Sequence, residues 1–133
     1  MQPKLKNIRV FVYGTLRKEE RNSYLLKDAV FERLLQLKGF EMYSLGSYPF
    51  ILPSSSEKII IAESYLVDEI ILEKLDLLEE YFGEGHPDNR YDRIDVRDEL
   101  GRSGSIYVFS PLKWPSYKTK AKLLPSGDWK KSK

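Results

Sequence analysis

One acidic side chain lies among apolar ones in the helix-forming stretch DEIILEKLDLLEEYFG. A helix turns about 100° per residue, so Glu79 falls roughly 40° from Leu75, inside the apolar face. The polar face carries the other acids of the helix, which are Glu69, Glu73, Asp76 and Glu80. An inward carboxylate is costly unless it is paired or neutral. Glu79 is therefore the first candidate for chemistry.

Burial raises the pKa of a carboxyl group toward neutrality, where it can accept a proton and later return it. Two structural interpretations of Glu79 stay open. One is an ion pair with Arg90 or Arg93, since such pairs also perturb carboxylates. The other is a frayed last helical turn that releases Glu79 to solvent.

A second candidate is the turn within RVFVYGTLRKEERN, where a predicted strand ends at Gly14. Glycine permits unusual backbone angles and lets another group approach the chain closely. Successive N–H groups at such a bend can bind an anion. The segment lacks the glycine spacing and the lysine of a phosphate-binding loop. It is either a plain turn or one wall of a pocket, with the polar run after Leu16 as the wet rim.

Three further residues lie where they could reach the same site. Tyr91 and Arg93 come shortly after the helix, on one face of a predicted strand, and could orient Glu79. Tyr48, in Ser-Tyr-Pro, either lines a pocket or belongs to a turn. His86, the single histidine, follows a glycine-rich loop and is expected to be solvated.

The elements that must position these residues are mostly strands. We expect strands over residues 9–13, 31–37, 39–44, 58–67, 90–97 and 105–110, with a turn-rich passage over 45–57. A helix over 68–82 has Asp68 as its N-cap and Gly83 as its stop, and a short helix is expected over 21–27. The absence of βαβ alternation predicts an α+β fold.

Composition limits the function classes. The 133 residues suit a single domain over 1–133, with a basic, solvated tail from about residue 118. There is no cysteine and one histidine, so thiolate chemistry and histidine-based metal clusters are excluded. A net charge of +2 does not favour nucleic acid, and no segment approaches the roughly 20 apolar residues of a membrane span. We expect a cytoplasmic protein without a cofactor; its oligomeric state is not indicated.

Seven segments occur in the order typical of the γ-glutamylcyclotransferase-like proteins, which include the γ-glutamylamine cyclotransferases and the AIG2-like group. From about Val10 to Trp129, the chain resembles this family in FVYGTLR, SLGSYPFILP, ESYLVDE, LDLLEEYFG, NRYDRIDV, IYVF and SGDW. The resemblance implies a small mixed β-barrel flanked by a few helices. It also implies conversion of a γ-glutamyl compound to 5-oxoproline with release of an amine.

The resemblance also implies roles for individual residues. The family's substrate-binding loop corresponds to Tyr13, Gly14, Thr15 and Leu16, and its catalytic glutamate follows a Leu-Asp pair and corresponds to Glu79. Its later tyrosine and arginine correspond to Tyr91 and Arg93. The family commonly has glycine after the catalytic glutamate, where this chain has Glu80.

Two other functions are weighed against catalysis. A non-catalytic protein of the same fold would bind γ-glutamyl or similar carboxylate ligands without turnover. A small basic β-domain that binds RNA would need a contiguous basic and aromatic face. The acidic helix face and the near-neutral net charge weigh against RNA.

Overall fold

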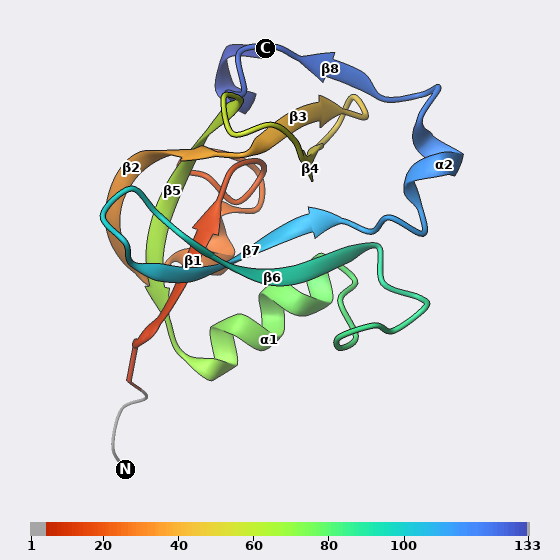
Figure 1. Ribbon diagram of the computed structural model, residues 1–133. Helices are drawn as coiled ribbons and strands as arrows, with labels where there is room; N and C mark the ends of the chain where they lie inside the picture. The colour runs from red at the N-terminus through yellow and green to blue at the C-terminus, as the bar shows by residue number, and fades with distance from the viewer. Residues whose placement is uncertain (1–4, 133) are drawn as a thin grey trace.

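Two β-sheets and a few short helices make up the fold in the computed structural model, which describes residues 5–132 (Figure 1). The larger sheet has the order β2 (Val30–Lys38), β5 (Ile59–Val67), β1 (Ile8–Val12), β7 (Ser103–Phe109) and β6 (Tyr91–Arg97). The smaller sheet has the order β4 (Pro49–Pro53), β3 (Phe40–Ser44) and β8 (Lys122–Leu124). The helical elements are η1 (Ser23–Leu26), α1 (Glu69–Leu78), α2 (Trp114–Tyr117) and η2 (Trp129–Ser132).

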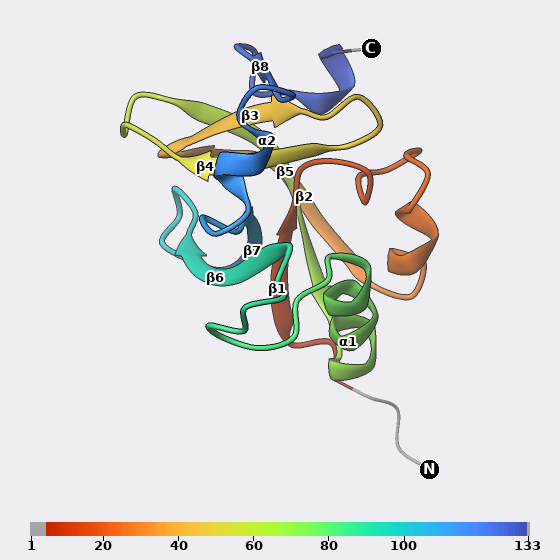
Figure 2. The ribbon, with the colours of Figure 1, turned by 90° about the vertical axis from the view of Figure 1, so that its right-hand side faces the viewer.

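Strand β1 is the centre of the larger sheet. It pairs antiparallel with β5 and parallel with β7, so the sheet is mixed. Its side chains alternate between two cores, as the period of a strand requires. Val10 and Val12 face the core beneath α1, whereas Phe11 and Tyr13 face the core beneath the smaller sheet. Figure 2 shows α1 and the smaller sheet at opposite ends of the molecule.

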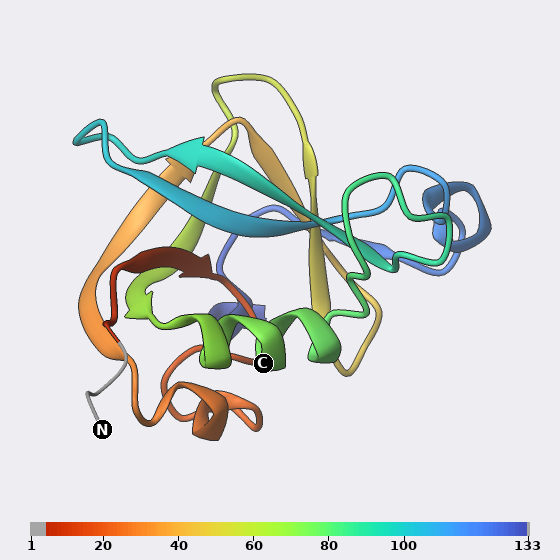
Figure 3. The same cartoon turned by 90° about the horizontal axis from the view of Figure 1, so that it is seen from below.

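Helix α1 begins where β5 ends and lies across the lower face of the molecule (Figure 3). Asp68 caps it, because its carboxylate accepts a hydrogen bond from the N–H of Ile71 at 2.8 Å. Ile71 and Leu75 are the buried residues of the helix. The η1 segment packs beside α1, so the chain after β1 and the helix come together.

The α+β class is confirmed, but hydrogen bonding leaves the larger sheet open, so the expected closed barrel is not formed by strand pairing. Side chains connect the open edge instead. Arg33 of β2 donates to Asp98 at 3.0 Å and to Glu99 at 2.6 Å, in the turn after β6. The two edges of the larger sheet are therefore linked by ion pairs instead of by backbone hydrogen bonds between strands.

Three local expectations are corrected. The turn-rich passage contains β4, which pairs with β3 through Phe50 and Ile51 among others. Helix α1 ends at Leu78 instead of residue 82. The lysine-rich tail is not a solvated terminus, because β8 pairs with β3 and Trp129 is 3% exposed. Strands β4 and β8 are too short to show a clear sequence period, and β8 pairs with a strand far away in the chain. Helix α1 ends early because Glu80, which is not a glycine, takes a left-handed backbone. No helix among the described residues is long and apolar enough to span a membrane.

Candidate active site

The C-terminal end of α1 is tightly terminated, so Glu79 is not released by fraying. The N–H of Tyr81 donates to the carbonyl of Asp76 at 2.9 Å, and the N–H of Glu80 donates to Leu77 at 3.2 Å. This pair of bonds is a Schellman motif, in which the residue after the cap adopts a left-handed backbone. That residue is Glu80, with a φ of 53°, in the position that usually favours glycine. Glu79 is the cap itself.

A cavity of about 210 Å³ lies where the end of β1, the segment before β4, the end of α1 and the strands β6 and β7 meet. Seven of the eight predicted site residues line it together: Tyr13, Gly14, Thr15, Leu16, Tyr48, Glu79 and Tyr91. The lining also contains residues that sequence reasoning did not select for the site, which are Phe11, Val12, Arg21, Asn22, Pro49, Leu78, Glu80, Arg90 and Tyr107. Arg93 is not part of the lining.

Within residues 5–132, neither a hydrogen bond nor an ion pair reaches the Glu79 carboxylate. Arg90 lies 3.8 Å from Glu80, and Arg93 pairs with Asp76, so neither expected partner of Glu79 is used. Burial, with a smaller contribution from the nearby charge of Glu80, raises the pKa of the Glu79 carboxyl to about 8. A carboxyl group with this pKa can exchange a proton near neutral pH.

Gly14 is required by close packing. Its φ is not in the left-handed region, but a Cβ at this position would lie 2.6 Å from the Cγ of Pro49. The turn closes through a hydrogen bond from the N–H of Arg17 to the carbonyl of Gly14 at 3.0 Å. Such a turn does not use the N–H groups of its two central residues, here Thr15 and Leu16. Both residues line the cavity, so these donors are available near it.

Tyrosine hydroxyls hold the walls of the cavity in place. Tyr13 donates to the carbonyl of Tyr107 at 2.7 Å, and Tyr91 donates to the carbonyl of Pro49 at 3.0 Å. Burial raises the pKa of Tyr13, and the charge of Glu79 adds to the effect. Burial likewise raises the pKa of Tyr91. Both rings therefore remain neutral donors and form an apolar surround for Glu79.

Asp76 has a role that the helical wheel did not reveal. The wheel placed it on the polar face, but Arg93 donates to its two carboxylate oxygens at 2.6 and 2.5 Å. The hydroxyl of Tyr107 donates to the same carboxylate at 2.7 Å. Arg93 and Tyr107 are cross-strand neighbours on β6 and β7, so their meeting depends on sheet register. Arg93 thus fastens α1 to the sheet one turn before Glu79 and does not contact Glu79 itself.

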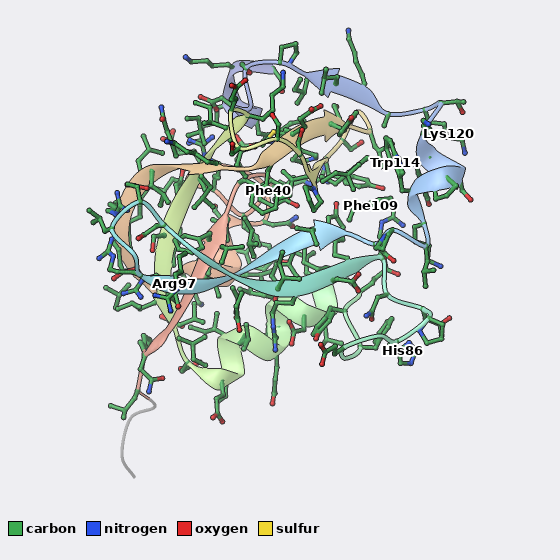
Figure 4. All side chains as sticks on the ribbon, viewed as in Figure 1. Phe40, His86, Arg97, Phe109, Trp114 and Lys120 are labelled. Atoms are coloured by element: carbon green, nitrogen blue, oxygen red, sulfur yellow. The ribbon has the colours of Figure 1, made fainter. Side chains whose placement is uncertain are left out.

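Arg90 lies at the rim of the cavity between aromatic rings. Its guanidinium donates to the hydroxyl of Tyr48 and lies 5.2 Å from the Tyr48 ring and 5.5 Å from the Tyr117 ring. His86 is exposed, as expected, in the loop between α1 and β6 (Figure 4). Among residues 5–132 there is no cluster of three or more His, Cys, Asp or Glu that could hold a metal ion.

Residues 10–131 match the sequence model of the family described as gamma-glutamyl cyclotransferase, AIG2-like. The chain belongs to this family. A gamma-L-glutamyl-butirosin B gamma-glutamyl cyclotransferase from Niallia circulans is 35% identical over 100 residues, which cover 74% of this chain and 62% of that protein. This chain therefore spans less than two thirds of that relative's length. The family protein YtfP of Escherichia coli K12 is 32% identical over 92% of this chain and 96% of its own length.

Solved structures agree with this γ-glutamylcyclotransferase fold. The solution structure of Escherichia coli YtfP has a TM-score of 0.66 at 29% identity and covers 95% of this chain and 100% of that one. An uncharacterized protein from Pyrococcus horikoshii has a TM-score of 0.73 at 23% identity, with 95% and 92% of the two chains covered. A mouse AIG2-like protein has a TM-score of 0.67 at 22% identity, with 92% and 87% covered. The last two likenesses concern the fold alone.

Proposed function

We propose that this γ-glutamylcyclotransferase-like chain converts a γ-glutamyl amine or γ-glutamyl peptide to 5-oxoproline and a free amine. The observation that carries the proposal is the Glu79 carboxyl, which lines the cavity without a charged partner and has a pKa of about 8. A structural ion pair would instead hold the carboxylate against a cation. The reacting molecule is small, and no cofactor is needed for the steps below.

The first step is proton transfer from the substrate's α-ammonium group to Glu79. The substrate's α-ammonium group stands beside a free carboxylate, so its pKa lies above the roughly 8 of a chain N-terminus. A Glu79 carboxyl with a pKa of about 8 is much closer to that value than an ordinary carboxylate, which makes proton transfer to it easier. The freed amine then attacks the γ-carbonyl carbon and closes a five-membered ring.

The second step breaks the original amide bond. Glu79, now protonated, donates its proton to the leaving nitrogen, and the bond between that nitrogen and the γ-carbon breaks. The ring nitrogen loses its second hydrogen as a proton, which the released amine takes up to become an ammonium ion, and the Glu79 carboxylate is restored. Attacking and attacked groups belong to one molecule, and the gain therefore comes from holding them in a reactive geometry. The N–H groups of Thr15 and Leu16 are suited to bind the substrate carboxylate or the developing oxyanion.

The walls of the cavity support selection of the γ-glutamyl end. Tyr13, Tyr48 and Tyr91 bring rings into the cavity, and Gly14 allows Pro49 to approach the turn. The leaving group extends toward the rim that contains Glu80 and Arg90. The Niallia circulans relative is named for a γ-glutamyl-butirosin substrate, which supports including γ-glutamylamines among the candidates.

The test is a substrate panel of γ-glutamyl dipeptides, γ-glutamylamines and glutathione, with 5-oxoproline as the measured product. Glu79→Gln should abolish product formation, because the amide cannot exchange the proton. Glu73→Gln removes the same charge from the exposed side of α1 and should remain active. Turnover that persists in Glu79→Gln would exclude the role of this carboxyl. Binding of the ligands without any turnover would favour the non-catalytic alternative.

A further inference from the structure

The C-terminal SGDW segment, residues 126–129, packs against strand β5. Gly127 accepts a hydrogen bond from the N–H of Ile61 at 2.8 Å. A Cβ on Gly127 would lie 2.2 Å from the carbonyl oxygen of Ile59, and its φ is 67°, so only glycine fits here. The segment therefore docks against β5 in one defined position.

Arg17 connects this segment to the turn that lines the cavity. The sequence suggested a solvated rim after Leu16, yet Arg17 is 4% exposed. Its Nε donates to Glu63 at 2.9 Å and its Nη1 donates to Asp128 at 2.8 Å. One buried guanidinium thus joins β5 and the C-terminal segment immediately after Leu16.

The partner carboxylate is itself fully engaged. The second oxygen of Glu63 accepts hydrogen bonds from the N–H of Lys18 at 3.0 Å and from the hydroxyl of Tyr65 at 3.1 Å. A further link joins the same two segments, since the indole N–H of Trp129 donates to Glu20 at 2.9 Å. The chain from Arg17 to Glu20 is therefore attached to the C-terminal segment at two points.

The turn is also closed on its other side. Asn22 donates to the Thr15 hydroxyl at 2.8 Å and, through its backbone N–H, to the Thr15 carbonyl at 2.9 Å. A buried ion-pair network adds little net stability compared with apolar packing, but it can select one conformation. The conformation selected here is that of the turn whose residues Thr15 and Leu16 line the cavity.

We propose that Arg17 and Asp128 are positioning residues, through which the C-terminal segment holds the turn of residues 14–17 in its substrate-binding shape. This inference rests on the proposed function for its effect on turnover. Neither residue lines the cavity, so both act through the turn and neither contacts substrate. Weaker positioning reduces binding of the substrate carboxylate in the ground state and the transition state alike, which raises KM with kcat little changed.

The experiment compares Asp128→Ala with Asp128→Asn and Arg17→Lys in the full chain. In the wild type the N–H of Lys130 donates to Asp128 at 3.0 Å, and the side-chain oxygen of asparagine can accept the same hydrogen bond. Asparagine has no charge, so its bond to Arg17 is weaker. Lysine keeps the positive charge beside Glu63, but it lacks the planar guanidinium through which Arg17 binds Glu63 and Asp128 together. Lys131→Gln, at an exposed position of η2, is the control. Hydrogen exchange of residues 14–22 is followed without ligand, and KM and kcat are measured with the best substrate of the panel.

Asp128→Ala should accelerate exchange over residues 14–22 while β5 and α1 stay protected, and it should raise KM about tenfold. Asp128→Asn and Arg17→Lys should give intermediate values, and the control should match the wild type. Unchanged exchange in the turn overturns the proposal, and so does a KM that stays at the wild-type value. A wild-type chain that makes no 5-oxoproline contradicts the proposed function, while localised exchange would still support the positioning of the turn.

Discussion

Replacing Glu79 by glutamine should change the pH dependence of folding stability, even before any substrate is added. The folded-state pKa of Glu79 is about 8, against an ordinary value of 4.5. Between these values the folded chain keeps the proton and the unfolded chain has lost it, so stability falls as pH rises. Glutamine does not titrate, and this loss should therefore be absent from the Glu79→Gln variant.

The size of the effect follows from the shift. A difference of about 3.5 pH units corresponds to at most about 5 kcal/mol at 1.36 kcal/mol per unit. The cavity opens to solvent and Glu79 is only half-buried by exposed area, so water offsets part of this burial. We expect that Glu79→Gln is more stable than the wild type by about 2 kcal/mol at pH 9, and that the two are nearly equal at pH 4.

The assay is urea unfolding at pH 4, 6, 7.5 and 9, followed by circular dichroism. Glu73→Gln serves as the matched control, because it removes an exposed carboxylate from the same helix. Its stability should run parallel to that of the wild type over the whole range. If the difference between Glu79→Gln and the wild type is the same at pH 4 and pH 9, the carboxyl group does not have a raised pKa, and the reasoning about Glu79 fails.

Three other changes test separate parts of the structure. Glu80→Gly should stabilise the chain by about 1 kcal/mol in thermal unfolding, because glycine adopts the left-handed backbone at the end of α1 without strain. The same change removes the Glu80 charge and should therefore lower the pKa of Glu79. A loss of stability would contradict the first expectation. Gly14→Ala should destabilise the fold by about 1–3 kcal/mol and lower turnover, because the added Cβ meets Pro49 at 2.6 Å, and unaltered kinetics would argue against close packing at the turn. Burial by itself would raise the pKa of Asp98, but hydrogen bonds from Arg102, Arg33 and Leu100 lower it to about 2. Asp98→Asn should therefore lower the free energy of unfolding by about 1–2 kcal/mol at pH 7, a figure reduced to allow for the partly exposed arginines. In urea unfolding, the difference from the wild type should shrink as the pH falls from about 3.8 to 2, because Asp98 becomes protonated in the unfolded and then in the folded state.

The helical period was sufficient to identify Glu79 as an inward residue, but it did not predict the contacts of Asp76 on the same helix. Residues four apart on a helix share a face, so the inward direction of Glu79 relative to Leu75 follows from spacing alone. The same wheel assigned Asp76 to the polar face, because a wheel contains no information about which strand lies beside the helix. The contacts of Asp76 with Arg93 and Tyr107 arise from the register of β6 with β7.

The burial of Arg17, after the first strand, could not be predicted from the local sequence either. Arg17 follows Leu16 in a run of polar residues, and local composition predicts a solvated rim. Its partners Glu63 and Asp128 are 46 and 111 residues away in the chain, so no local pattern could indicate that the guanidinium is enclosed. The burial of Trp129 in the tail has the same origin.

The sequence by itself determined the α+β class, the strand over residues 9–13, the inward carboxylate and the turn at Gly14, because each depends on residues a few positions apart. Tertiary structure decided that the turn and Glu79 line one cavity, that the larger sheet stays open and that the C-terminal segment braces the turn. The residues that meet in these features are far apart in the chain. Arg17 lies 46 residues from Glu63 and 111 from Asp128, and Gly14 lies 65 residues from Glu79. Over such distances, packing and strand register decide which groups meet, and neither is encoded in any single stretch of the chain.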